Sequence, residues 1–316
     1  MTPAKDWVIS PDEMKRLGKL TLEEKVSYTV ALLQEWYDHF GGKVYVAFSG
    51  GKDSTVLLHL ARSYVDPNIP GVFSDTGLEY PEIREFVKTK ENIIWIKPEK
   101  SFRWVIQHNG YPVISKMVST AVRHLQHPRP SNENIRHLVD TGYTRSGKYS
   151  PRFRLANKWR FLVDAPFPVS EKCCNYLKKT PFKKFERASG LKRILGVMQT
   201  DSQIRRYRLL RAGFNNYANE TSTPLGFWSE QDILLYLKTT GIPFCSIYGE
   251  ISQAENCLEV TGLTRTGCMF CMFGIQAEKS PNRFQRMKVD HPAQWKYCMD
   301  KLGIRGVMDY LGYPVE

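Results

Sequence analysis

The sequence predicts an α/β protein built on a doubly wound, mostly parallel β-sheet, with a basic insertion and a helical C-terminal region. Three observations predict this class. Short apolar runs alternate with helical segments three times within residues 43–108, as in sheets whose parallel strands are joined by helices. Proline and glycine interrupt a basic stretch at about 120–165, and residues 281–316 have the periodicity of amphipathic helices.

The N-terminal part is expected to be helical. Thr21 and Glu24 have the spacing of a capping box, in which each side chain accepts a hydrogen bond from the backbone of the other residue. A helix over about 22–40 should follow and end at Gly41-Gly42, because glycine readily adopts the backbone conformation that stops a helix.

Three strand–helix pairs come next. In each pair a short apolar run, typical of a buried strand, precedes a longer segment with helical periodicity. The expected strands are 43–48, 71–74 and 92–96, and the expected helices are 54–64, 81–90 and 101–108. Beyond the insertion, a strand is expected at 191–197 and a helix at 228–239, opened by Ser229.

This pattern divides the chain into an N-terminal helical segment (1–42), an α/β domain (43–240) and a C-terminal region (241–316). With 316 residues, 42% of them hydrophobic, the chain can bury a core, which excludes global disorder and a disulfide-stapled miniprotein. No apolar run is long enough to span a membrane, and residues 1–19 lack the apolar centre of a signal peptide. We therefore expect a cytoplasmic protein without membrane contact, whose seven cysteines are thiols or metal ligands.

The net charge of +13 is concentrated in one part of the chain. Residues 116–211 contain 22 Lys and Arg against 6 Asp and Glu, whereas the flanking parts are close to neutral. Aromatic side chains that could stack on bases are interleaved with these cations, at Tyr143, Tyr149, Phe153, Trp159 and Phe161. Concentrated positive charge attracts polyanions. Nucleic acid is therefore the expected partner, with a solvated basic face and a pocket for a small anion as the alternatives.

The residues after the first expected strand have the composition of a phosphate-binding loop. They are Ser49-Gly-Gly-Lys-Asp-Ser-Thr55. Two glycines allow a tight turn, and the following helix N-terminus, the hydroxyl groups and Lys52 all attract phosphate. Asp53 would be repelled by a phosphate unless a divalent cation lay between them, which indicates Mg²⁺. The spacing of the glycines and the lysine differs from that of the Walker loop. The alternative is a glycine turn that binds no ligand.

Ser-Gly-Gly-x-Asp-Ser is the signature of the PP-loop pyrophosphatase superfamily, and the chain resembles the phosphoadenylylsulfate (PAPS) reductase-like family within it. Three further stretches carry this resemblance: 73–82, 196–205 and 223–236. It implies a PP-loop fold of the HUP type (adenine nucleotide alpha hydrolase-like) that binds ATP or another adenosine nucleotide with Mg²⁺. It also implies catalytic roles for Lys52, Asp53 and Ser54. The nucleotide-binding residues that it implies are Ser49, Gly50, Gly51, Lys52, Asp53, Ser54, Thr55, Asp75, Thr76, Gly77, Asp201 and Arg205.

Four cysteines form the pattern CC…CxxC. They are Cys173, Cys174, Cys268 and Cys271. A CxxC turn directs two thiolates toward one metal site, and adjacent cysteines suit an iron–sulfur cubane, in which they can bind different irons. The pattern is similar to that of the iron–sulfur adenylylsulfate reductases of this family, which implies a [4Fe–4S] cluster on these four residues. Zinc and reduced structural thiols are the alternatives.

Two departures from the reductases concern function. Met198 stands where they usually carry an arginine, and they end in a Glu-Cys-Gly-Leu-His tail whose cysteine attacks the sulfonyl sulfur. Here Cys298 lacks that context. Cys245 and Cys257 remain outside the pattern; each is expected to be a small buried residue, and Cys257 is the first to test as a persulfide carrier.

Three functions are therefore considered. The first is an ATP pyrophosphatase that adenylates an acceptor and inserts sulfur into nucleic acid, resembling the ATP pyrophosphatase subunits of DNA phosphorothioation systems or a tRNA-thiolating counterpart. Its expected partners are a nucleic acid and a sulfur donor such as a cysteine desulfurase, and a homodimer is left open. The second is an adenylylsulfate or PAPS reductase that releases sulfite with thioredoxin. The third is a non-enzymatic nucleic-acid-binding or redox-sensing iron–sulfur protein, which the intact loop disfavours.

Overall fold

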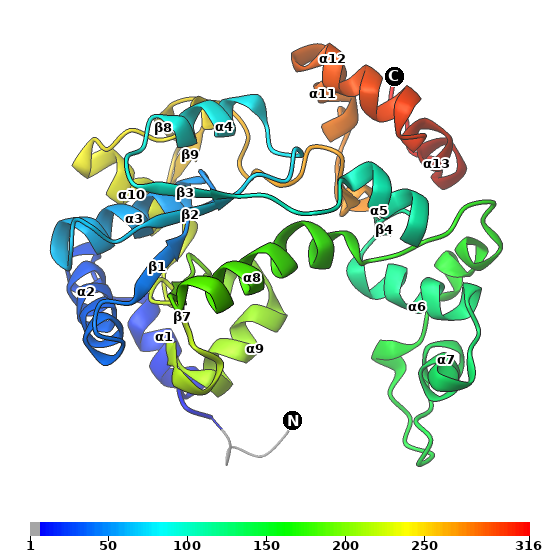
Figure 1. Cartoon of the computed structure of the whole chain (residues 1–316), viewed down its shortest axis with the longest axis horizontal. Helices are drawn as coiled ribbons and strands as arrows, with labels where there is room; N and C mark the ends of the chain where they lie inside the picture. Colours follow the sequence, from blue (N-terminus) through cyan, green and yellow to red (C-terminus); the bar gives the residue numbers. More distant parts are fainter. Residues whose placement is uncertain (1–6) are drawn as a thin grey trace. The chain divides into compact units, whose positions relative to one another are not determined.

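The computed structural model describes residues 7–316, which form two compact units (Figure 1). Unit 1 consists of the segment that ends at Asp75 together with Glu79–Lys97 and Phe182–Thr266. Unit 2 consists of Thr76–Leu78, Pro98–Pro181 and Gly267–Glu316. This partition is not contiguous, unlike the ranges 1–42, 43–240 and 241–316, because the chain returns to the sheet of unit 1 after building part of unit 2.

The sheet of unit 1 has six strands in the order β3-β2-β1-β5-β7-β6. The strands are β1 (Val44–Ala47), β2 (Gly71–Ser74), β3 (Ile93–Ile96), β5 (Lys192–Ile194), β6 (Asn215–Asn216) and β7 (Thr221–Ser222). All neighbours are parallel except β6 and β7. The predicted α/β class with a mostly parallel sheet is confirmed.

Helices connect these strands. They are α1 (Pro11–Gly18), α2 (Leu22–His39), α3 (Lys52–Tyr64), α4 (Pro81–Lys88), α8 (Thr180–Ser189), α9 (Gln203–Ala212) and α10 (Glu230–Thr240). The capping box of α2 is present, since the Glu24 N–H donates to Thr21 Oγ1 (3.3 Å) and the Thr21 N–H donates to Glu24 Oε2 (2.8 Å). Helix α3 begins two residues before the expected start because Gly51 is its N-cap. Ser229 caps α10 as predicted.

The core of unit 1 lies between the sheet and these helices. Trp36 of α2, Leu57 of α3 and Trp228 before α10 are fully buried and join one apolar cluster with Val46 of β1 and Ile194 of β5. Burying side chains of this size stabilises each by about 1.5–3 kcal/mol relative to exposure. The cluster therefore holds β1 and α3, and with them the loop that joins them, in a fixed position.

Unit 2 is mainly helical, with one short parallel pair of strands, β4 (Val113–Ile114) and β10 (Met272–Phe273). Its α-helices are α5 (Phe102–Asn109), α6 (Lys116–Gln126), α7 (Glu133–Thr141), α11 (Arg283–Asp290), α12 (Pro292–Lys296) and α13 (Ile304–Leu311). Short 3-10 helices occupy Pro151–Phe153 (η3) and Asn157–Asp164 (η4). Single π-helical turns occupy Asn175–Lys179 (η5) and Tyr297–Lys301 (η10). The helical C-terminal region that the sequence predicts is confirmed.

Within residues 7–316, none of the helices combines the length and the apolar composition that crossing a bilayer requires.

Candidate functional site

The candidate nucleotide site follows β1. Strand β1 pairs with β2 on one side and with β5 on the other. The chain runs outward from β1 through β2 to β3 and later returns to β5, so the carboxyl end of β1 is a topological switch point. Open α/β sheets bind their ligands at such points. The Ser49–Thr55 loop begins here, two residues after β1 ends at Ala47.

The backbone of this loop turns sharply at Gly50, where φ is +72°. A β-carbon at this position would lie 2.8 Å from a methyl group of Val87 and 2.9 Å from one of Ile83, both on α4. Glycine is therefore required both for the turn and for the close approach of α4. Ser49 and Ser54 close the loop, because their hydroxyl oxygens are 3.1 Å apart and the Ser49 N–H donates to Ser54 Oγ (3.2 Å).

The N-terminus of α3 points its first amides at the loop. Gly51 provides no side-chain cap, so the N–H groups of the first three helical residues have no acceptor within the helix. The hydroxyls of Ser54 and Thr55 donate to the Gly51 carbonyl at 2.9 and 3.0 Å, which fixes the turn without occupying those amides. Uncapped amides and the positive end of the helix dipole favour an anionic ligand.

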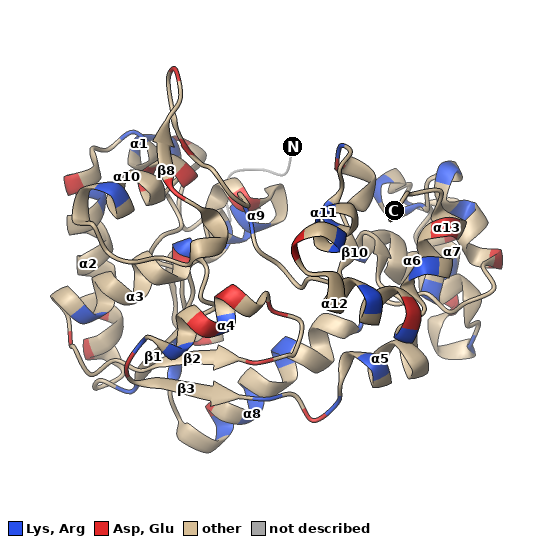
Figure 2. Ribbon diagram, turned by 90° about the horizontal axis from the view of Figure 1, so that it is seen from above, with Lys and Arg blue, Asp and Glu red and all other residues tan. Residues whose placement is uncertain are grey.

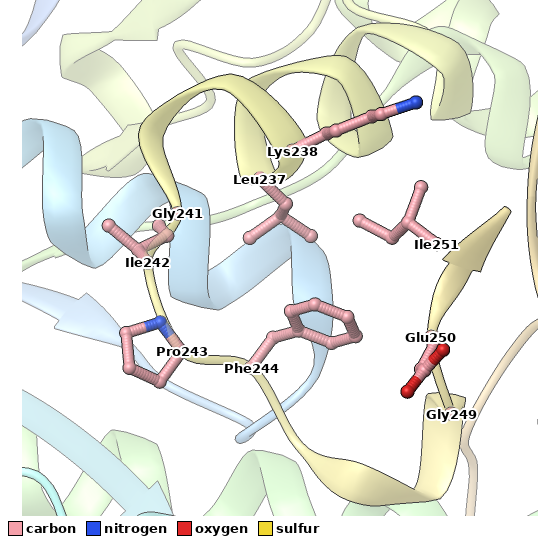
Figure 3. A pocket seen from close by; sticks show the side chains of 9 residues that line it. All are labelled: Leu237, Lys238, Gly241, Ile242, Pro243, Phe244, Gly249, Glu250 and Ile251. Atoms are coloured by element: carbon pink, nitrogen blue, oxygen red, sulfur yellow. The ribbon is translucent and has the colours of Figure 1, made fainter.

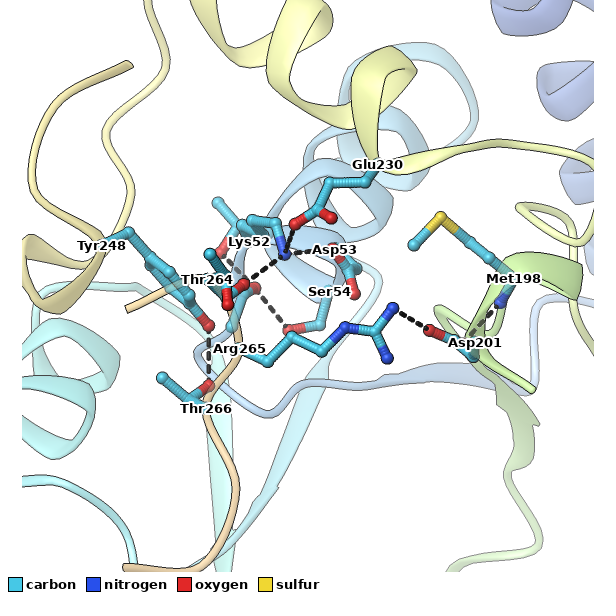
Figure 4. Close-up of polar contacts among 12 residues, drawn as sticks. Lys52, Asp53, Ser54, Met198, Asp201, Glu230, Tyr248, Thr264, Arg265 and Thr266 are labelled. Carbon is cyan, nitrogen blue, oxygen red and sulfur yellow. Dashed lines mark hydrogen bonds and ion pairs between the residues drawn. The ribbon is translucent and has the colours of Figure 1, made fainter. Parts of the chain in front are cut away.

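Lys52 supplies a buried cation beside these amides. Its side chain is 5% exposed, and its ammonium donates to the Thr264 carbonyl at 3.0 Å. Glu230, at the start of α10, lies 3.0 Å from the ammonium, and the Tyr248 ring centroid is 5.5 Å away. Figure 4 shows these partners arranged around the lysine. The ammonium is thus held in place by segments far from it in the sequence.

Asp53 has the features expected of a cation ligand. Its Oδ1 is buried and has no hydrogen-bond partner in the described part of the chain. The nearest cation is the Lys52 ammonium, 3.6 Å from this oxygen and beyond hydrogen-bonding distance. Burial raises the pKa of Asp53, the charges of Asp201 and Glu230 raise it further, and Lys52 opposes the rise. A buried carboxylate oxygen without a donor fits Mg²⁺, which prefers carboxylate and phosphate oxygens.

A second predicted carboxylate, Asp75, follows β2. Its Oδ2 accepts a hydrogen bond from Arg84 of α4 at 3.0 Å. Its Oδ1 is buried and, within residues 7–316, has no hydrogen-bond partner. Asp75 closes the first segment of unit 1, whereas Thr76 and Gly77 belong to unit 2. In unit 2 the Leu78 N–H donates to Thr76 Oγ1 at 3.2 Å.

Asp201 and Arg205 form a pair, as their spacing on the sequence allows. Asp201 Oδ2 accepts hydrogen bonds from the Met198 N–H (3.0 Å) and from the Arg205 guanidinium. Arg265 adds a second guanidinium, 3.6 Å from Asp201 Oδ1. Arg265 is 57% exposed while Asp201 is 8% exposed, so the aspartate anchors two arginines that can reach an anionic ligand.

Four residues of this site were missed by the sequence analysis: Glu230, Tyr248, Thr264 and Arg265. Burial raises the pKa of Tyr248 to about 12, so its hydroxyl stays protonated; this hydroxyl is 2.7 Å from Thr266 Oγ1. Thr264 and Arg265 immediately precede the stretch that leads into the CxxC turn. Their closeness to the CxxC turn in the sequence suggests a role near the cysteines, and nothing in the sequence indicates their contact with the Ser49–Thr55 loop.

The four predicted metal ligands line one cavity of unit 2. Its lining residues are Cys173, Cys174, Cys268 and Cys271 with Leu78, Phe102, Pro112, Leu177 and Lys178. No disulfide involves any of the seven cysteines. The structure therefore brings together two cysteine pairs that are about one hundred residues apart in the chain, and surrounds them mostly with apolar side chains.

One extended segment positions both pairs. Tyr111 forms a parallel bridge with Val169, shortly before Cys173, and β4 pairs with β10, which begins directly after Cys271. Gly110 allows the first contact, because a β-carbon there would lie 2.4 Å from the Pro168 carbonyl oxygen. Residues 110–114 thus hold the two cysteine-bearing segments side by side.

The thiols have unequal environments. A hydrogen bond from Cys173 lowers the pKa of Cys174, and the charges of Lys116 and Lys178 lower it further. Burial raises the pKa of Cys271. Across residues 7–316, no three His, Cys, Asp or Glu side chains converge closely enough to hold a single metal ion. The four cysteines nevertheless line a single cavity.

The other cysteines lie outside this cavity. Cys245 and Cys298 are fully buried, and burial raises the pKa of both thiols. Cys257 lies between β8 (Ile251–Gln253) and β9 (Leu258–Val260), with its sulfur 3.6 Å from a carboxylate oxygen of Glu259.

A further cavity in unit 1 borders the C-terminal end of α10 (Figure 3). Apolar residues such as Leu237, Pro243 and Phe244 line it, with Lys238 and Glu250 as its charged members. It is separate from the Ser49–Thr55 loop in its lining residues and offers no uncapped helix N-terminus. The loop therefore remains the candidate nucleotide site.

One known family matches the segment that contains this loop. Residues 43–140 match the family described as phosphoadenosine phosphosulfate reductase domain. Within these 98 residues, the chain is similar to PAPS reductase domains. The matched residues include β1, the Ser49–Thr55 loop and Asp75, so the candidate phosphate-binding loop lies inside the segment that matches this family.

Two curated proteins match this chain at low identity or over a short stretch. An uncharacterised protein of Methanocaldococcus jannaschii is 22% identical over 292 residues, which cover 90% of this chain and 46% of the relative. A second uncharacterised protein of that organism is 32% identical over 109 residues, which cover 32% of this chain and 26% of the relative. The chain thus spans less than half the length of these curated relatives.

Two solved structures share a distant likeness. PAPS reductase from Candida auris has a TM-score of 0.38 and 12% identity, covering 79% of this chain and 98% of the reductase chain. FMN adenylyltransferase from Candida glabrata has a TM-score of 0.40 and 14% identity, covering 74% of this chain and 64% of that enzyme.

Proposed function

We propose that this protein is an ATP pyrophosphatase that adenylates an oxygen of its acceptor and then exchanges this oxygen for sulfur. One observation carries the proposal. The Ser49–Thr55 loop leads into uncapped amides of α3, with the buried Lys52 and the hydrogen-bond-deficient Oδ1 of Asp53 beside them. Backbone amides, a cation and a metal-seeking oxygen are the groups that a magnesium-bound triphosphate requires.

The first chemical step would be adenylation. An acceptor oxygen attacks the α-phosphorus of ATP, the bond from this phosphorus to the oxygen that bridges to the β-phosphate breaks, and pyrophosphate leaves. Lys52 and the first amides of α3 would stabilise the charge that accumulates on the departing phosphates. Asp53 would hold Mg²⁺ through its Oδ1. The Ser49 hydroxyl would turn from Ser54 to donate to a phosphate oxygen, while the Ser54 hydroxyl keeps the turn closed through the Gly51 carbonyl.

The second step would deliver sulfur. Sulfide attacks the activated centre, the bond to the adenylated oxygen breaks, and AMP leaves without a change in oxidation state. If the donor, such as a cysteine desulfurase, supplies a persulfide, its outer sulfur must first be reduced by two electrons from a thiol to the oxidation state of sulfide. A [4Fe–4S] cluster bound by Cys173, Cys174, Cys268 and Cys271 would supply a binding place for sulfide and would fix residues 110–114 between the two cysteine pairs.

The proposed acceptor is a nucleic acid. The excess of Lys and Arg within residues 116–211 supports a polyanionic substrate, because such a concentration of charge attracts phosphate backbones. Lys and Arg recur along the helices and loops of unit 2 (Figure 2).

A reductase that releases sulfite from adenylylsulfate or PAPS is the second candidate, and the domain match at 43–140 favours it. This reaction needs an accessible cysteine to attack the sulfonyl sulfur. Cys298 cannot serve without rearrangement, because it is fully buried in η10 and its thiol pKa is raised by burial.

The two candidates differ in their products. The full chain, purified without oxygen, is given either ATP with Mg²⁺ or adenylylsulfate with thioredoxin. We expect pyrophosphate from ATP, with more released when DNA or RNA is added. Sulfite from adenylylsulfate would instead establish the reductase, and a protein that forms neither product would be a non-enzymatic binding protein.

Three alanine variants test whether the loop is responsible for this activity. Lys52→Ala should abolish pyrophosphate release, and Asp53→Ala should do the same. Lys43→Ala serves as the matched control, because Lys43 precedes β1 and is exposed. Normal turnover by Lys52→Ala would refute the assignment of the loop.

A further inference from the structure

One short stretch of unit 2 combines charge and exposed rings more densely than the rest. Residues 143–161, here called the 143–161 segment, contain six Lys or Arg, five aromatic residues and no Asp or Glu. It runs from the end of α7 through η3 into η4. Contacts within unit 2 fix the positions of its rings and of two of its cations.

The segment begins with a hairpin that presents two tyrosines. Tyr143 and Tyr149 form an antiparallel bridge, and their ring centroids are 4.8 Å apart. The Thr144 N–H donates to the Lys148 carbonyl (2.9 Å), and the Ser150 N–H donates to the Gly142 carbonyl (2.7 Å). Although this network orders the hairpin, the tyrosines remain 46% and 50% exposed.

A second group of rings comes from η4 and α13. Phe161 lies 5.7 Å from Tyr310, and the Tyr310 hydroxyl donates to the Phe161 carbonyl at 3.1 Å. Trp159 lies 6.4 Å from Phe161. Phe161 and Tyr310 are 40% and 38% exposed. Exposed rings are usually scattered singly, so two ordered groups in one region are unusual for a surface without a ligand.

The cations of the segment are available for phosphates. Of its six Lys and Arg, Arg160 alone forms an ion pair among the described residues, with Asp140. Arg152 lies over the Phe153 ring at 4.6 Å, and Lys158 lies over the Trp159 ring at 5.2 Å. Rings and cations therefore alternate along the segment, a composition typical of sites where bases stack and the backbone is neutralised.

We propose that the 143–161 segment, with Tyr310, binds unpaired nucleotides of a single-stranded nucleic acid. This inference rests on the proposed function, since it identifies the surface that would hold the acceptor and the form of that acceptor. Unpaired bases are favoured over duplex because ring faces are reached only by bases released from their pairs. Except for Tyr310 on α13, the rings also lie on a hairpin and 3-10 turns and not on a helix suited to the major groove.

Binding is tested by fluorescence anisotropy with labelled oligonucleotides of about 15 bases. The same sequence is offered as single-stranded DNA, as single-stranded RNA and as duplex DNA, at about 50 to 300 mM salt. We expect tighter binding of a single strand than of the duplex, and the DNA and RNA arms identify the acceptor. Tyr143→Leu and Phe161→Leu should each weaken single-strand binding by about 5- to 150-fold with little change in salt dependence.

Charge and ring variants separate the two contributions. Lys148→Gln with Arg152→Gln should reduce the slope of log affinity against log salt by about 0.7 for each lost phosphate contact. Phe153→Leu repeats the ring test at a site outside the hairpin bridge, and melting temperatures report whether each variant is folded. Tyr64→Leu is the matched control, because Tyr64 is 53% exposed in unit 1 and should not affect binding.

The outcomes distinguish this inference from the proposed function. Equal or tighter binding of duplex, unchanged affinity of folded ring variants, or equal binding of a protein polyanion such as polyglutamate would overturn the inference. Pyrophosphate release in the absence of nucleic acid should be the same for the ring variants and the unaltered chain. A lack of pyrophosphate release by the unaltered chain even when nucleic acid is present would refute the proposed function and leave the binding result standing.

Discussion

At the residue scale, the site contains a carboxylate that the protein alone does not satisfy. Asp53 Oδ1 is buried next to two other acidic side chains, Asp201 and Glu230, and the charged form of Asp53 is disfavoured. Such groups commonly mark functional sites, because a structure without a role for them would gain stability by losing the charge. In the proposed function, Mg²⁺ and phosphate complete this environment.

Asp53→Asn should therefore stabilise the protein in the absence of nucleotide. Because the pKa of Asp53 is raised in the folded state, the unaltered protein loses stability as the pH rises from the ordinary aspartate range through that raised value. The asparagine variant should lack this loss and melt at a higher temperature near neutral pH. Thermal melts across pH test this.

The same substitution should remove Mg²⁺-dependent nucleotide binding. Adding Mg²⁺ and ATP should raise the melting temperature of the unaltered protein but not that of Asp53→Asn. An asparagine variant that is both less stable without ligand and equally stabilised by Mg²⁺ and ATP would contradict the assigned role.

The cysteines provide a second test at this scale. Cys173→Ser should lower the iron and sulfide content of anoxically purified protein and weaken its visible absorbance, because a hydroxyl replaces one of four thiolate ligands. Metal analysis and absorption spectra measure both. Cys257→Ser is the matched control and should retain the chromophore. Zinc in place of iron in the unaltered protein would remove the basis of the cluster assignment.

At the scale of elements, the loop depends on how closely α4 approaches it. Gly50→Ala would place a methyl group within 3 Å of Val87 and Ile83 and would strain a residue at φ +72°. We expect a loss of about 2–4 kcal/mol in the free energy of unfolding, together with loss of nucleotide binding.

Gly190→Ala separates backbone strain from the steric clash. Gly190 has a similar φ of +74°, but a β-carbon there would have no neighbour within 4 Å. This variant should lose about 1 kcal/mol and keep its nucleotide affinity. Denaturant titrations of both variants measure the difference, and equal losses would show that the contact with α4 is unimportant.

Most regular elements could be predicted from the sequence because their signals are local. The capping box at Thr21, the apolar run at 43–48 and the cap at Ser229 each depend on residues within a few positions of one another. Strands β6 and β7 have two residues each. Such short strands show no periodicity, and their pairing comes from the tertiary fold alone.

The same distinction applies to the candidate site. The loop residues are contiguous, so the sequence alone predicts that they can bind phosphate. The partners of Lys52 are far from it in the sequence. Thr264 is 212 positions away, and Glu230 and Tyr248 come from other elements. Whether such residues meet is decided by packing of the whole sheet, which a one-dimensional pattern does not encode.

At the scale of the whole molecule, the two candidate sites belong to different units. The Ser49–Thr55 loop and its partners lie in unit 1, and the four cysteines lie in unit 2. Each site should therefore respond locally to its own ligand.

Hydrogen exchange measured by mass spectrometry tests this assignment. Mg²⁺ and ATP should slow exchange at the start of α3 and around Thr264. Removal of iron by a chelator should speed exchange at 110–114 and in β10, because the segments that these residues join would lose their common ligand. Protection by ATP confined to residues 98–181 would contradict the placement of the nucleotide.

The interleaving of the units also sets the order in which a ribosome can complete them. Strands β1, β2 and β3 emerge early, but β5, which covers the other edge of β1, emerges only after residues 98–181 have been made. During translation the nascent half-sheet has an open edge at β1, a place where strands of other chains can add. Slow synthesis of the middle of the chain would prolong this exposure, so newly made protein should need chaperone protection most before Lys192 is reached.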